Sequence, residues 1–389
     1  MQLEYRDSFG VEVESLGKGL CRGMLAMVAG LLLAGCGPDG PLRVGFVGGL
    51  SDQNSDVGQA GYNGVLLAVE QVNRAGGIKG RKIEVVARDD AQDRETAARS
   101  ASELAAAKVE AVIGPFTSGM AAVVVPVLAG SGTLVISPTV SSMDFVGKDD
   151  NLVRINRSTR DNARDYARVI HRLGQRRVAV AYDERNRSFS VSWLNEFRKA
   201  FAEQGGAVVT EVAYESRRDT DFGGVVGAML KNAPDGLFFI AGGIDVARLA
   251  QQARRQAPAL PIGASEWAAS EQLIELGGKV VEGLLIVQNY DRDDHSPRYS
   301  EFREAYFKRF QKNPGYSSVS AYDAAMVLFD ALSRRTGDES PKAAVLRRGP
   351  YQGLQQQIVF DANGDTQRKA FFTQIRDGGY RKLDEALAR

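Results

Sequence analysis

Cysteine and histidine are scarce in this sequence, which contains two of each: Cys21, Cys36, His171 and His295. His171 lies within a helical pattern, and His295 lies in the run DRDDHSP, which is typical of a charged surface turn. Neither has a cysteine, histidine or aspartate at the spacing of a metal site. An enzyme would need a nucleophile with its base, or a metal cluster. The sequence therefore predicts a protein that is not an enzyme and that holds neither a metal nor a cofactor.

An excess of charge of one sign is also missing. Lys and Arg number 49 against 48 Asp and Glu, a formal net charge of +1. Basic residues form no run longer than pairs such as Arg176–Arg177 and Arg217–Arg218. Proteins that bind nucleic acid carry clustered Lys and Arg, so we expect no nucleic-acid partner. The stretch GFVGGL lacks the G-x-G-x-x-G spacing of a dinucleotide site.

No hydrophobic run is long enough to cross a bilayer as a helix, which takes about 20 residues. The longest apolar run near the start, Met24–Ala34, has 11 residues, follows Lys18 and Arg22, and leads into Leu33-Ala34-Gly35-Cys36. This order resembles the bacterial lipobox, in which a peptidase cuts before the cysteine and the cysteine is lipidated. We expect residues 1–35 to be a signal peptide and residues 36–41 a lipidated tether.

The acidic residues among positions 1–15 fit a signal peptide poorly, which indicates that translation starts further downstream. Cleavage before Cys36 would remove Cys21, so the mature protein would contain no disulfide. Gly37 follows the cysteine, and the choice between inner and outer membrane stays open.

Strand and helix patterns alternate along most of the chain. A strand at 42–50, a helix at 58–78 and a strand at 82–90 begin a βα rhythm, which restarts after about residue 158. Near-continuous apolar strands in such a rhythm predict parallel sheets with helices on both faces, hence an α/β fold in two halves. Helices dominate from 297 to 349, and the tail predicts strands joined by a turn at Asn363–Gly364.

In parallel sheets, ligands bind beyond the carboxyl ends of the strands. In VIGPFTSGM, Thr117 and Ser118 stand where a strand ends and a helix begins. Backbone N–H groups and the helix dipole favour an anion there, and Thr139 and Ser141 follow the next strand. The corner predicts a site for a carboxylate with an ammonium nearby. The alternative is that Ser118 only caps the helix.

Four stretches of the chain match the pattern of a known family: YNGVLLAVEQVNRAGGIKGRKIEVVARDDAQD, VEAVIGPFTSG, LVISPTVS and SAYDAAMVLFDAL. They resemble the branched-chain amino acid binding proteins of ABC importers. These are type I periplasmic binding proteins, and the resemblance covers roughly residues 42–385. It implies two Rossmann-like lobes that close like a hinge, joined by three crossovers near residues 158, 289 and 370. Lobe 1 would comprise 42–158 and 290–370, and lobe 2 would comprise 159–289 and 371–389.

The resemblance also implies roles for single residues. Ser118, beside Thr117, would bind the ligand carboxylate, the backbone C=O of Thr139 would accept from the ammonium, and Ser141 would contact the same end. Lobe 2 would offer an acid to the ammonium, either at Glu266 or with Ser265 in its place. The loop that contains Gly242 and Gly243 would line the same cleft.

Two positions depart from the family pattern. Val57 stands where an aromatic residue is frequent, and Arg187 stands in place of a tyrosine. An arginine in the cleft would suit a ligand with extra negative charge, unless it points into solvent.

The resemblance implies a substrate-binding lipoprotein on the periplasmic side of the envelope. Its partners would be a small carboxylate ligand, an ABC permease with its ATPase, and the membrane through lipid on Cys36. The alternative is a ligand sensor, or a lipoprotein partner of envelope machinery, that has the same fold and does not transport.

Overall fold

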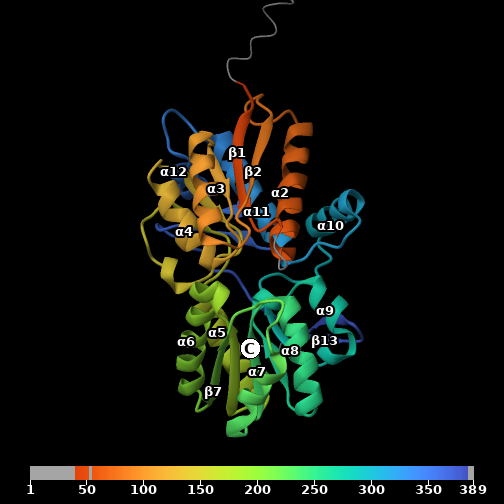
Figure 1. The fold of residues 1–389 in the computed structure, drawn as a ribbon. Coiled ribbons are helices and arrows are strands. Elements are labelled where there is room, and N and C mark those ends of the chain that lie inside the picture. Colours follow the sequence, from red (N-terminus) through yellow and green to blue (C-terminus); the bar gives the residue numbers. More distant parts are fainter. Residues whose placement is uncertain (1–39, 52–54, 384–389) are drawn as a thin grey trace, which may run out of the picture. The chain divides into compact units, whose positions relative to one another are not determined.

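The computed structural model describes residues 40–51 and 55–383, which form two α/β lobes (Figure 1). The predicted signal peptide and the predicted lipidation site, Cys36, lie outside the described residues. Each lobe is built on a sheet with helices on both of its faces, which confirms the expected α/β fold class.

The sheet of lobe 1 is parallel throughout and has the order β2-β1-β3-β4-β5. Side chains alternate across it: Phe46 packs with helices α2 and α11 on one face, and Val47 packs with α3 and α4 on the other. The elements of this lobe are β1 (Leu42–Gly48), α2 (Asp56–Arg74), β2 (Ile83–Asp89), α3 (Arg94–Ala106), β3 (Ala111–Ile113), α4 (Ser118–Ala129), β4 (Leu134–Ser137), η1 (Met143–Phe145), β5 (Leu152–Arg154), α10 (Pro297–Phe310), α11 (Tyr316–Arg334), α12 (Pro341–Arg348), β11 (Tyr351–Gln352) and β12 (Gln357–Ile358).

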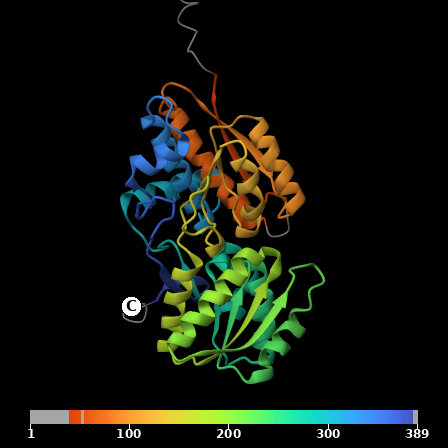
Figure 2. The ribbon, with the colours of Figure 1, turned by 90° about the vertical axis from the view of Figure 1, so that its left-hand side faces the viewer.

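The sheet of lobe 2 has the order β14-β13-β10-β9-β8-β6-β7. Strand β13 runs antiparallel to both of its neighbours, β10 and β14, and the remaining strand pairs are parallel. Val180 packs with α5 and α6 on one face, and Ala181 packs with α7 and α8 on the other. Figure 2 shows the helices on both sides of this sheet in the lower lobe. The elements of this lobe are α5 (Thr159–Arg172), β6 (Arg177–Asp183), η2 (Glu184–Asn186), α6 (Arg187–Glu203), β7 (Ala207–Tyr214), α7 (Phe222–Met229), η3 (Leu230–Asn232), β8 (Gly236–Ile240), α8 (Gly243–Gln256), β9 (Ile262–Ala264), η4 (Glu266–Ala268), α9 (Glu271–Gly277), η5 (Gly278–Val281), β10 (Leu285–Gln288), β13 (Phe371–Arg376) and β14 (Gly379–Lys382).

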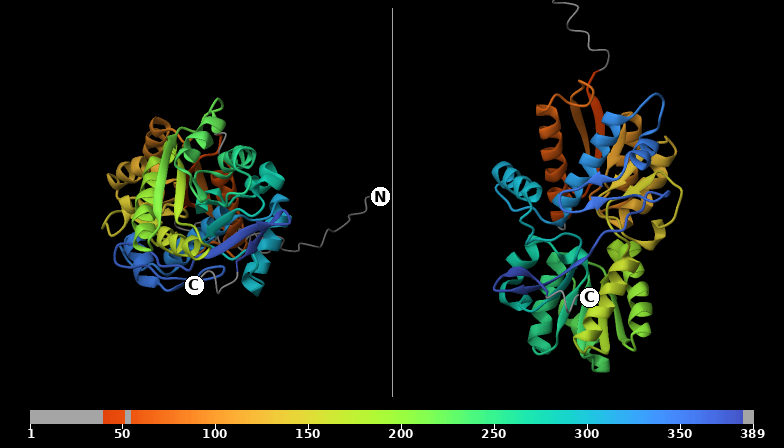
Figure 3. Two further views of the ribbon diagram at one scale, coloured as in Figure 1. Left: turned by 90° about the horizontal axis from the view of Figure 1, so that it is seen from below. Right: turned by 180° about the vertical axis from the view of Figure 1, so that it is seen from behind.

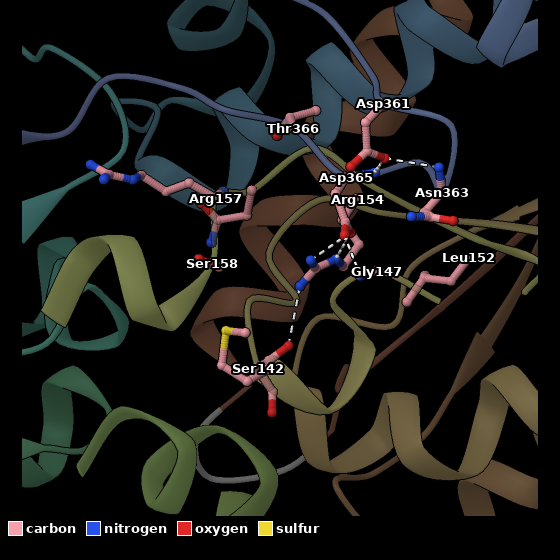
Figure 4. Close-up of polar contacts among 12 residues, drawn as sticks. Ser142, Gly147, Leu152, Arg154, Arg157, Ser158, Asp361, Asn363, Asp365 and Thr366 are labelled. Carbon is pink, nitrogen blue, oxygen red and sulfur yellow. Dashed lines mark hydrogen bonds and ion pairs between the residues drawn. The ribbon is translucent and has the colours of Figure 1, made fainter. Parts of the chain in front are cut away.

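The chain passes between the two sheets after β5, after β10 and before β13 (Figures 1 and 3). In Figure 1, β13 lies beside α9 in the lower lobe, although the preceding helix α12 lies in the upper one. The first and third passages are joined by a buried ion pair in which the Arg154 guanidinium lies 2.5 Å from Asp365 Oδ1 (Figure 4). Thr366 Oγ1 also donates to the Ile155 carbonyl at 3.0 Å. These contacts hold two of the connecting segments side by side.

The tail differs from the prediction. Around Asn363–Gly364 the chain makes a turn with a single bridge between Phe360 and Thr366. The longer hairpin, β13–β14, turns instead at Asp377–Gly378, where both residues have positive φ. Such a two-residue turn matches the twist of the strands it connects.

Candidate functional site

The carboxyl ends of both sheets meet at a small cavity of about 20 Å³. Lobe 1 and lobe 2 both line it, with Val57, Gly58, Gln92, Phe116, Thr117, Asp183, Arg185, Asn186 and Trp267. A cavity of this size holds about one water molecule. An amino acid can enter here only if the lobes first move apart.

The turn that begins α4 depends on Gly114. Its φ is +118°, and a Cβ at this position would lie 2.0 Å from the Val47 carbonyl oxygen, so only glycine fits. The chain then delivers Thr117 to the N-cap of α4 and Ser118 to its first helical position. Both side chains are buried.

The two hydroxyls do not cap α4. Thr117 makes no side-chain cap hydrogen bond, and its Oγ1 donates to Gln92 Oε1 at 3.0 Å. Ser118 Oγ accepts from the backbone N–H of Ser142 at 3.3 Å. The alternative that Ser118 only caps the helix is therefore wrong, because Thr117 is the N-cap residue and Ser118 instead links the strand ends that follow β3 and β4.

A side chain of lobe 2 occupies the N-terminus of α4. Asn186, the last residue of η2, is 5% exposed, and its Oδ1 accepts from the backbone N–H of Gly119 at 2.9 Å. A Cβ on Gly119 would lie 3.3 Å from the same oxygen, so glycine permits the close approach. The protein thus presents its own amide oxygen where the sequence predicts a bound anion.

Further hydrogen bonds hold the lobes together next to Asn186. The backbone N–H of Met143 in η1 donates to Ser192 Oγ in α6 at 3.0 Å, and Ser188 Oγ donates to Asp144 Oδ2 at 2.6 Å. Within lobe 2, Thr159 Oγ1 of α5 lies 2.7 Å from the same Ser192 Oγ. The structure is therefore a closed one, with α4 and η1 of lobe 1 seated on η2 and α6 of lobe 2.

The strand-end residues of lobe 1 are buried or half-buried. The Thr139 carbonyl, expected to accept from a ligand ammonium, accepts from Asn156 Nδ2 at 3.1 Å. Thr139 Oγ1 donates to the Phe116 carbonyl at 2.6 Å. Ser141 is completely buried, and its Oγ has no hydrogen-bond partner in the described part of the chain. A buried hydroxyl without a partner costs free energy, so this one is suited to a polar ligand.

Lobe 2 contributes Ser265 and Glu266 at the end of β9. Ser265 is completely buried, and its Oγ also has no partner among the described residues. Glu266 is 3% exposed, and its Oε2 accepts from Trp193 Nε1 at 2.8 Å. Burial raises the pKa of Glu266, while the Trp193 hydrogen bond and the neighbouring Asn162 oppose the rise.

Arg187 does not line the small cavity. Its guanidinium is 65% exposed and pairs with Glu184 one helical turn away. Gly242 is the N-cap of α8, and a Cβ there would lie 3.5 Å from the Trp267 indole. Gly243 follows it, and a Cβ on Gly243 would lie 2.4 Å from Ser270 Oγ. The two glycines therefore let α8 approach Trp267 and Ser270.

The sequence predicts that the loops Asp183–Phe189 and Gly242–Asp245 line the cleft, but it did not single out Asn186 or the buried acidic pair within them. Asp183 ends β6 and Asp245 lies in the first turn of α8, and each is 2% exposed. Asp183 Oδ1 accepts from the backbone N–H groups of Arg185 and Ser216, and Asp245 Oδ2 accepts from Tyr214 Oη at 3.2 Å. Burial, reinforced by the Asp245 charge, raises the pKa of Asp183 to about 6. Because one carboxyl ends a strand and the other begins a helix, these positions in the sequence could have identified both as candidates for the cleft.

A second, much larger cavity of about 560 Å³ lies beside the small one, and Val57 lines both. Its walls come from the start of α2, from α9, from the end of α10 and from the start of α11. The residues are Ser55, Asp56, Val57, Gln59, Ala60, Asn63, Ser270, Glu271, Gln272, Glu275, Tyr306, Phe307, Gln311, Lys312, Asn313, Gly315, Tyr316 and Ser317.

The chain belongs to the periplasmic binding protein family, whose profile matches residues 41–380. It is 23% identical over 355 residues to a Leu/Ile/Val-binding protein of Citrobacter freundii, covering 90% of this chain and 93% of that one. It is 22% identical over 331 residues to a leucine-, isoleucine-, valine-, threonine- and alanine-binding protein of Pseudomonas aeruginosa, covering 83% and 87%. A leucine-binding protein of Thermotoga maritima has the same fold, with a TM-score of 0.81, 24% identity and coverage of 88% and 98%.

These similarities confirm the resemblance seen in the sequence, and the fold is that of a type I periplasmic binding protein. Members of this family are substrate-binding proteins of ABC transporters, and the family supports a periplasmic location. Within residues 40–51 and 55–383, no group of three or more His, Cys, Asp or Glu side chains could hold a metal ion. The helices in those same ranges include none with the length and apolar character needed to cross a membrane.

Proposed function

We propose that this chain is the substrate-binding lipoprotein of an ABC importer and is not itself an enzyme. It would capture an amino acid or a similar small carboxylate between its lobes and deliver it to a permease and ATPase. The main support is the set of buried polar side chains at the strand ends of both lobes: Ser118 and Ser141 from lobe 1, and Ser265 and Glu266 from lobe 2. The names of the relatives, which include Leu/Ile/Val-binding proteins, point to the same class of ligand.

In this proposal the ligand carboxylate takes the place of Asn186 at the N-terminus of α4. The first backbone N–H groups and the dipole of that helix favour an anion over a neutral amide oxygen. Ser118 adds a hydroxyl at the same position, and Glu266 offers a carboxylate to the ammonium from the opposite lobe. The lobes open, exchange the Asn186 contact for the ligand, and close again.

Thermal unfolding in the presence of single amino acids tests this function. The protein is produced from its full-length gene, purified from membranes, and heated with each of the common amino acids in turn. A ligand at 100 times its Kd adds about 2.7 kcal/mol to the free energy of unfolding, so at least one amino acid should raise the Tm. A flat response to the whole panel and to short amides would remove the basis for the proposal.

The closed, nearly filled cleft favours one alternative, a lipoprotein that uses the same fold without transport. In that case the Asn186 contact would be the permanent state and an outer surface would bind a partner protein. The thermal panel separates the two, because a permanently closed cleft gives no shift with any amino acid.

We also propose that lipid on Cys36 anchors the protein to a membrane. The support is the order of basic flank, apolar run and Leu33-Ala34-Gly35-Cys36 in the sequence.

A further inference from the structure

Among the described residues that line the small cavity between the lobes, Asp183 alone carries a carboxylate. Asp183 ends β6 and is 2% exposed. Glu266, the acid expected to meet a ligand ammonium, is not one of these lining residues, and its Oε2 already accepts from Trp193. The acid that this cavity presents to a ligand is therefore Asp183.

The protein engages only one of the two oxygens of this carboxylate. Oδ1 accepts from the backbone N–H of Arg185 at 3.0 Å and from that of Ser216 at 3.1 Å, which fixes the side chain at the start of η2. Oδ2 accepts no hydrogen bond from the described part of the chain. A buried carboxylate oxygen can only accept, and it costs free energy while it lacks a donor. Because Asp183 lines the cavity, a ligand can supply that donor.

No ion pair with a described residue neutralises this carboxylate. The guanidinium of Arg185, which also lines the cavity, donates to the Ser216 carbonyl at 3.4 Å. Burial is the main reason why the pKa of Asp183 is raised to about 6; the Asp245 charge adds to the rise, whereas the two backbone hydrogen bonds and the Arg185 charge oppose it. A cationic group on the ligand would favour the ionised carboxylate and offset the effect of burial.

Asp183 also lies close to the position that the proposed function gives to the ligand carboxylate. It precedes Asn186 by one short turn, η2, and both side chains line the same cavity of about 20 Å³. The ligand carboxylate would displace Asn186 Oδ1 from the backbone N–H of Gly119. An α-amino acid carries its ammonium on the carbon next to its carboxylate. A ligand held at α4 therefore brings its ammonium into the space that Asp183 lines.

We propose that Asp183 is a further ligand-binding residue, whose Oδ2 accepts from the ligand ammonium, so that the protein selects α-amino acids over carboxylates that carry no ammonium. This proposal rests on the function proposed above and narrows its class of ligand. Asp183 bears the larger share of the ammonium contact, because Glu266 lies outside the cavity lining.

Titration calorimetry with matched pairs of probes tests the proposal. The pairs are L-leucine with 4-methylpentanoate and L-alanine with propanoate, or the corresponding pair for any other amino acid that raises the Tm. The members of a pair have the same carbon skeleton and differ in the ammonium. We expect the amino acid to bind roughly tenfold or more tightly than its partner, the scale of one charge-assisted hydrogen bond.

Asp183→Asn should reduce this preference severalfold, because it removes the charge and keeps an acceptor for the two backbone N–H groups. The ammonium-free probe should bind the variant at least as tightly as the native protein, which also shows that the variant is folded. Glu266→Gln should reduce the preference less. Asp235→Asn is the matched control, since Asp235 accepts from the backbone N–H groups of Arg176 and Arg177 at the other end of β6, and it should leave the preference unchanged.

The pH dependence of binding is a second readout, and it needs no variant. The affinity for the amino acid should rise as the pH increases through about 6, because the carboxyl must be ionised to attract the ammonium. The affinity for the ammonium-free probe should not rise. The other charged or titratable groups near this carboxyl are Asp245 and Arg248 of α8, Arg185 of η2 and Tyr214 of β7. Arginine and tyrosine keep their charge in this range, and Asp245→Asn should move the rise to lower pH without abolishing it.

The results also separate this proposal from the one on which it rests. An ammonium-free probe that binds as tightly as its amino acid would overturn the role of Asp183 and leave capture of a small carboxylate intact. A preference that survives Asp183→Asn, or that falls further in Glu266→Gln, would overturn it too, because the ammonium would then be recognised elsewhere. A flat thermal response to the whole amino acid panel would overturn both proposals.

Discussion

The side-chain oxygen of Asn186 accepts a hydrogen bond from the backbone N–H of Gly119 at 2.9 Å, and so joins η2 of one lobe to the first turn of α4 in the other. The contact lies where a ligand carboxylate would compete for the same donor. In the proposed function, the Asn186 side chain and the ligand compete for this one N–H group, which leads to a pair of predictions with opposite signs.

Replacement of Asn186 by alanine should favour the open protein and tighten ligand binding. The competing acceptor is lost, and one net hydrogen bond is worth about 1 kcal/mol, or roughly fivefold in affinity. Asn186→Asp should act in the other direction, because a carboxylate at a helix N-terminus strengthens the internal contact. Calorimetry with the best ligand of the thermal panel, together with small-angle scattering of the free protein, measures both effects. Equal affinities in the two variants would show that Asn186 does not compete with the ligand.

Ser118→Ala should weaken ligand binding by about 1–3 kcal/mol, because a charged ligand group loses one hydrogen bond in a buried site. Ser102→Ala is the matched control, since that serine is exposed on α3 and donates to its own helix at Ala98. Calorimetry checks both variants. An unchanged affinity in Ser118→Ala would mean that Ser118 serves only its contact with Ser142.

The stability of the protein should depend on Asp183 between about pH 4 and pH 6. Its pKa is raised from 3.8 to about 6, so the folded state binds more protons than the unfolded chain in this range. The contribution of this group to stability is full below the unfolded pKa and is lost as the pH rises through the folded one. A tenfold difference in proton affinity between the folded and unfolded states corresponds to about 1.4 kcal/mol in the free energy of unfolding. Urea unfolding measured across this range should give a profile that is flatter for Asp183→Asn, and parallel profiles would contradict the assignment.

The ion pair between the first and third interlobe passages should matter for stability. Arg154 is 2% exposed and Asp365 is 15% exposed, and Asp365 Oδ2 also accepts from the backbone N–H of Gly147. Asp365→Asn leaves a buried guanidinium without its counter-charge and should cost about 3 kcal/mol. Glu215→Gln, whose pair with Arg217 is exposed, should cost almost nothing. The urea midpoint measures both, and similar midpoints for the two variants would be contrary to expectation.

Cys36→Ser should move the protein from the membrane fraction to the soluble periplasmic fraction, because one lipidated residue provides the anchor. Cell fractionation with immunoblotting measures the change. Cys21→Ser is the matched control and should leave the distribution unchanged, since this cysteine lies before the predicted cleavage site. A Cys36→Ser protein that stays in the membrane fraction would contradict the lipobox prediction.

Local patterns predicted most of the fold. The βα rhythm could be read because buried parallel strands are almost continuously apolar. The cap of α3 is equally local, since the Asp93 carboxylate accepts from the Thr96 N–H at 2.8 Å, three residues away. The position of Ser118 at the start of α4 followed from the same kind of evidence.

The features that depend on contacts between distant segments were not predictable. Asn186 meets Gly119 across 67 residues, and nothing in the run DERN indicates which segment the amide will face. Arg187 was a candidate for the cleft, but its neighbour Glu184 holds it in solvent. Near Asn363, the Asp361 carboxylate stabilises the turn and Asp365 pairs with Arg154. Few residues on either side of the turn are therefore left to pair as strands.

The passages between the lobes also determine when each half can finish folding. In lobe 1, α2 packs against α11, which is separated from it by the whole parallel part of lobe 2. The interior of the first half therefore stays incomplete until residues beyond 316 have emerged from the ribosome or the export channel. In the exported lipoprotein proposed above, this order of assembly would keep lobe 1 unfolded for longer before translocation.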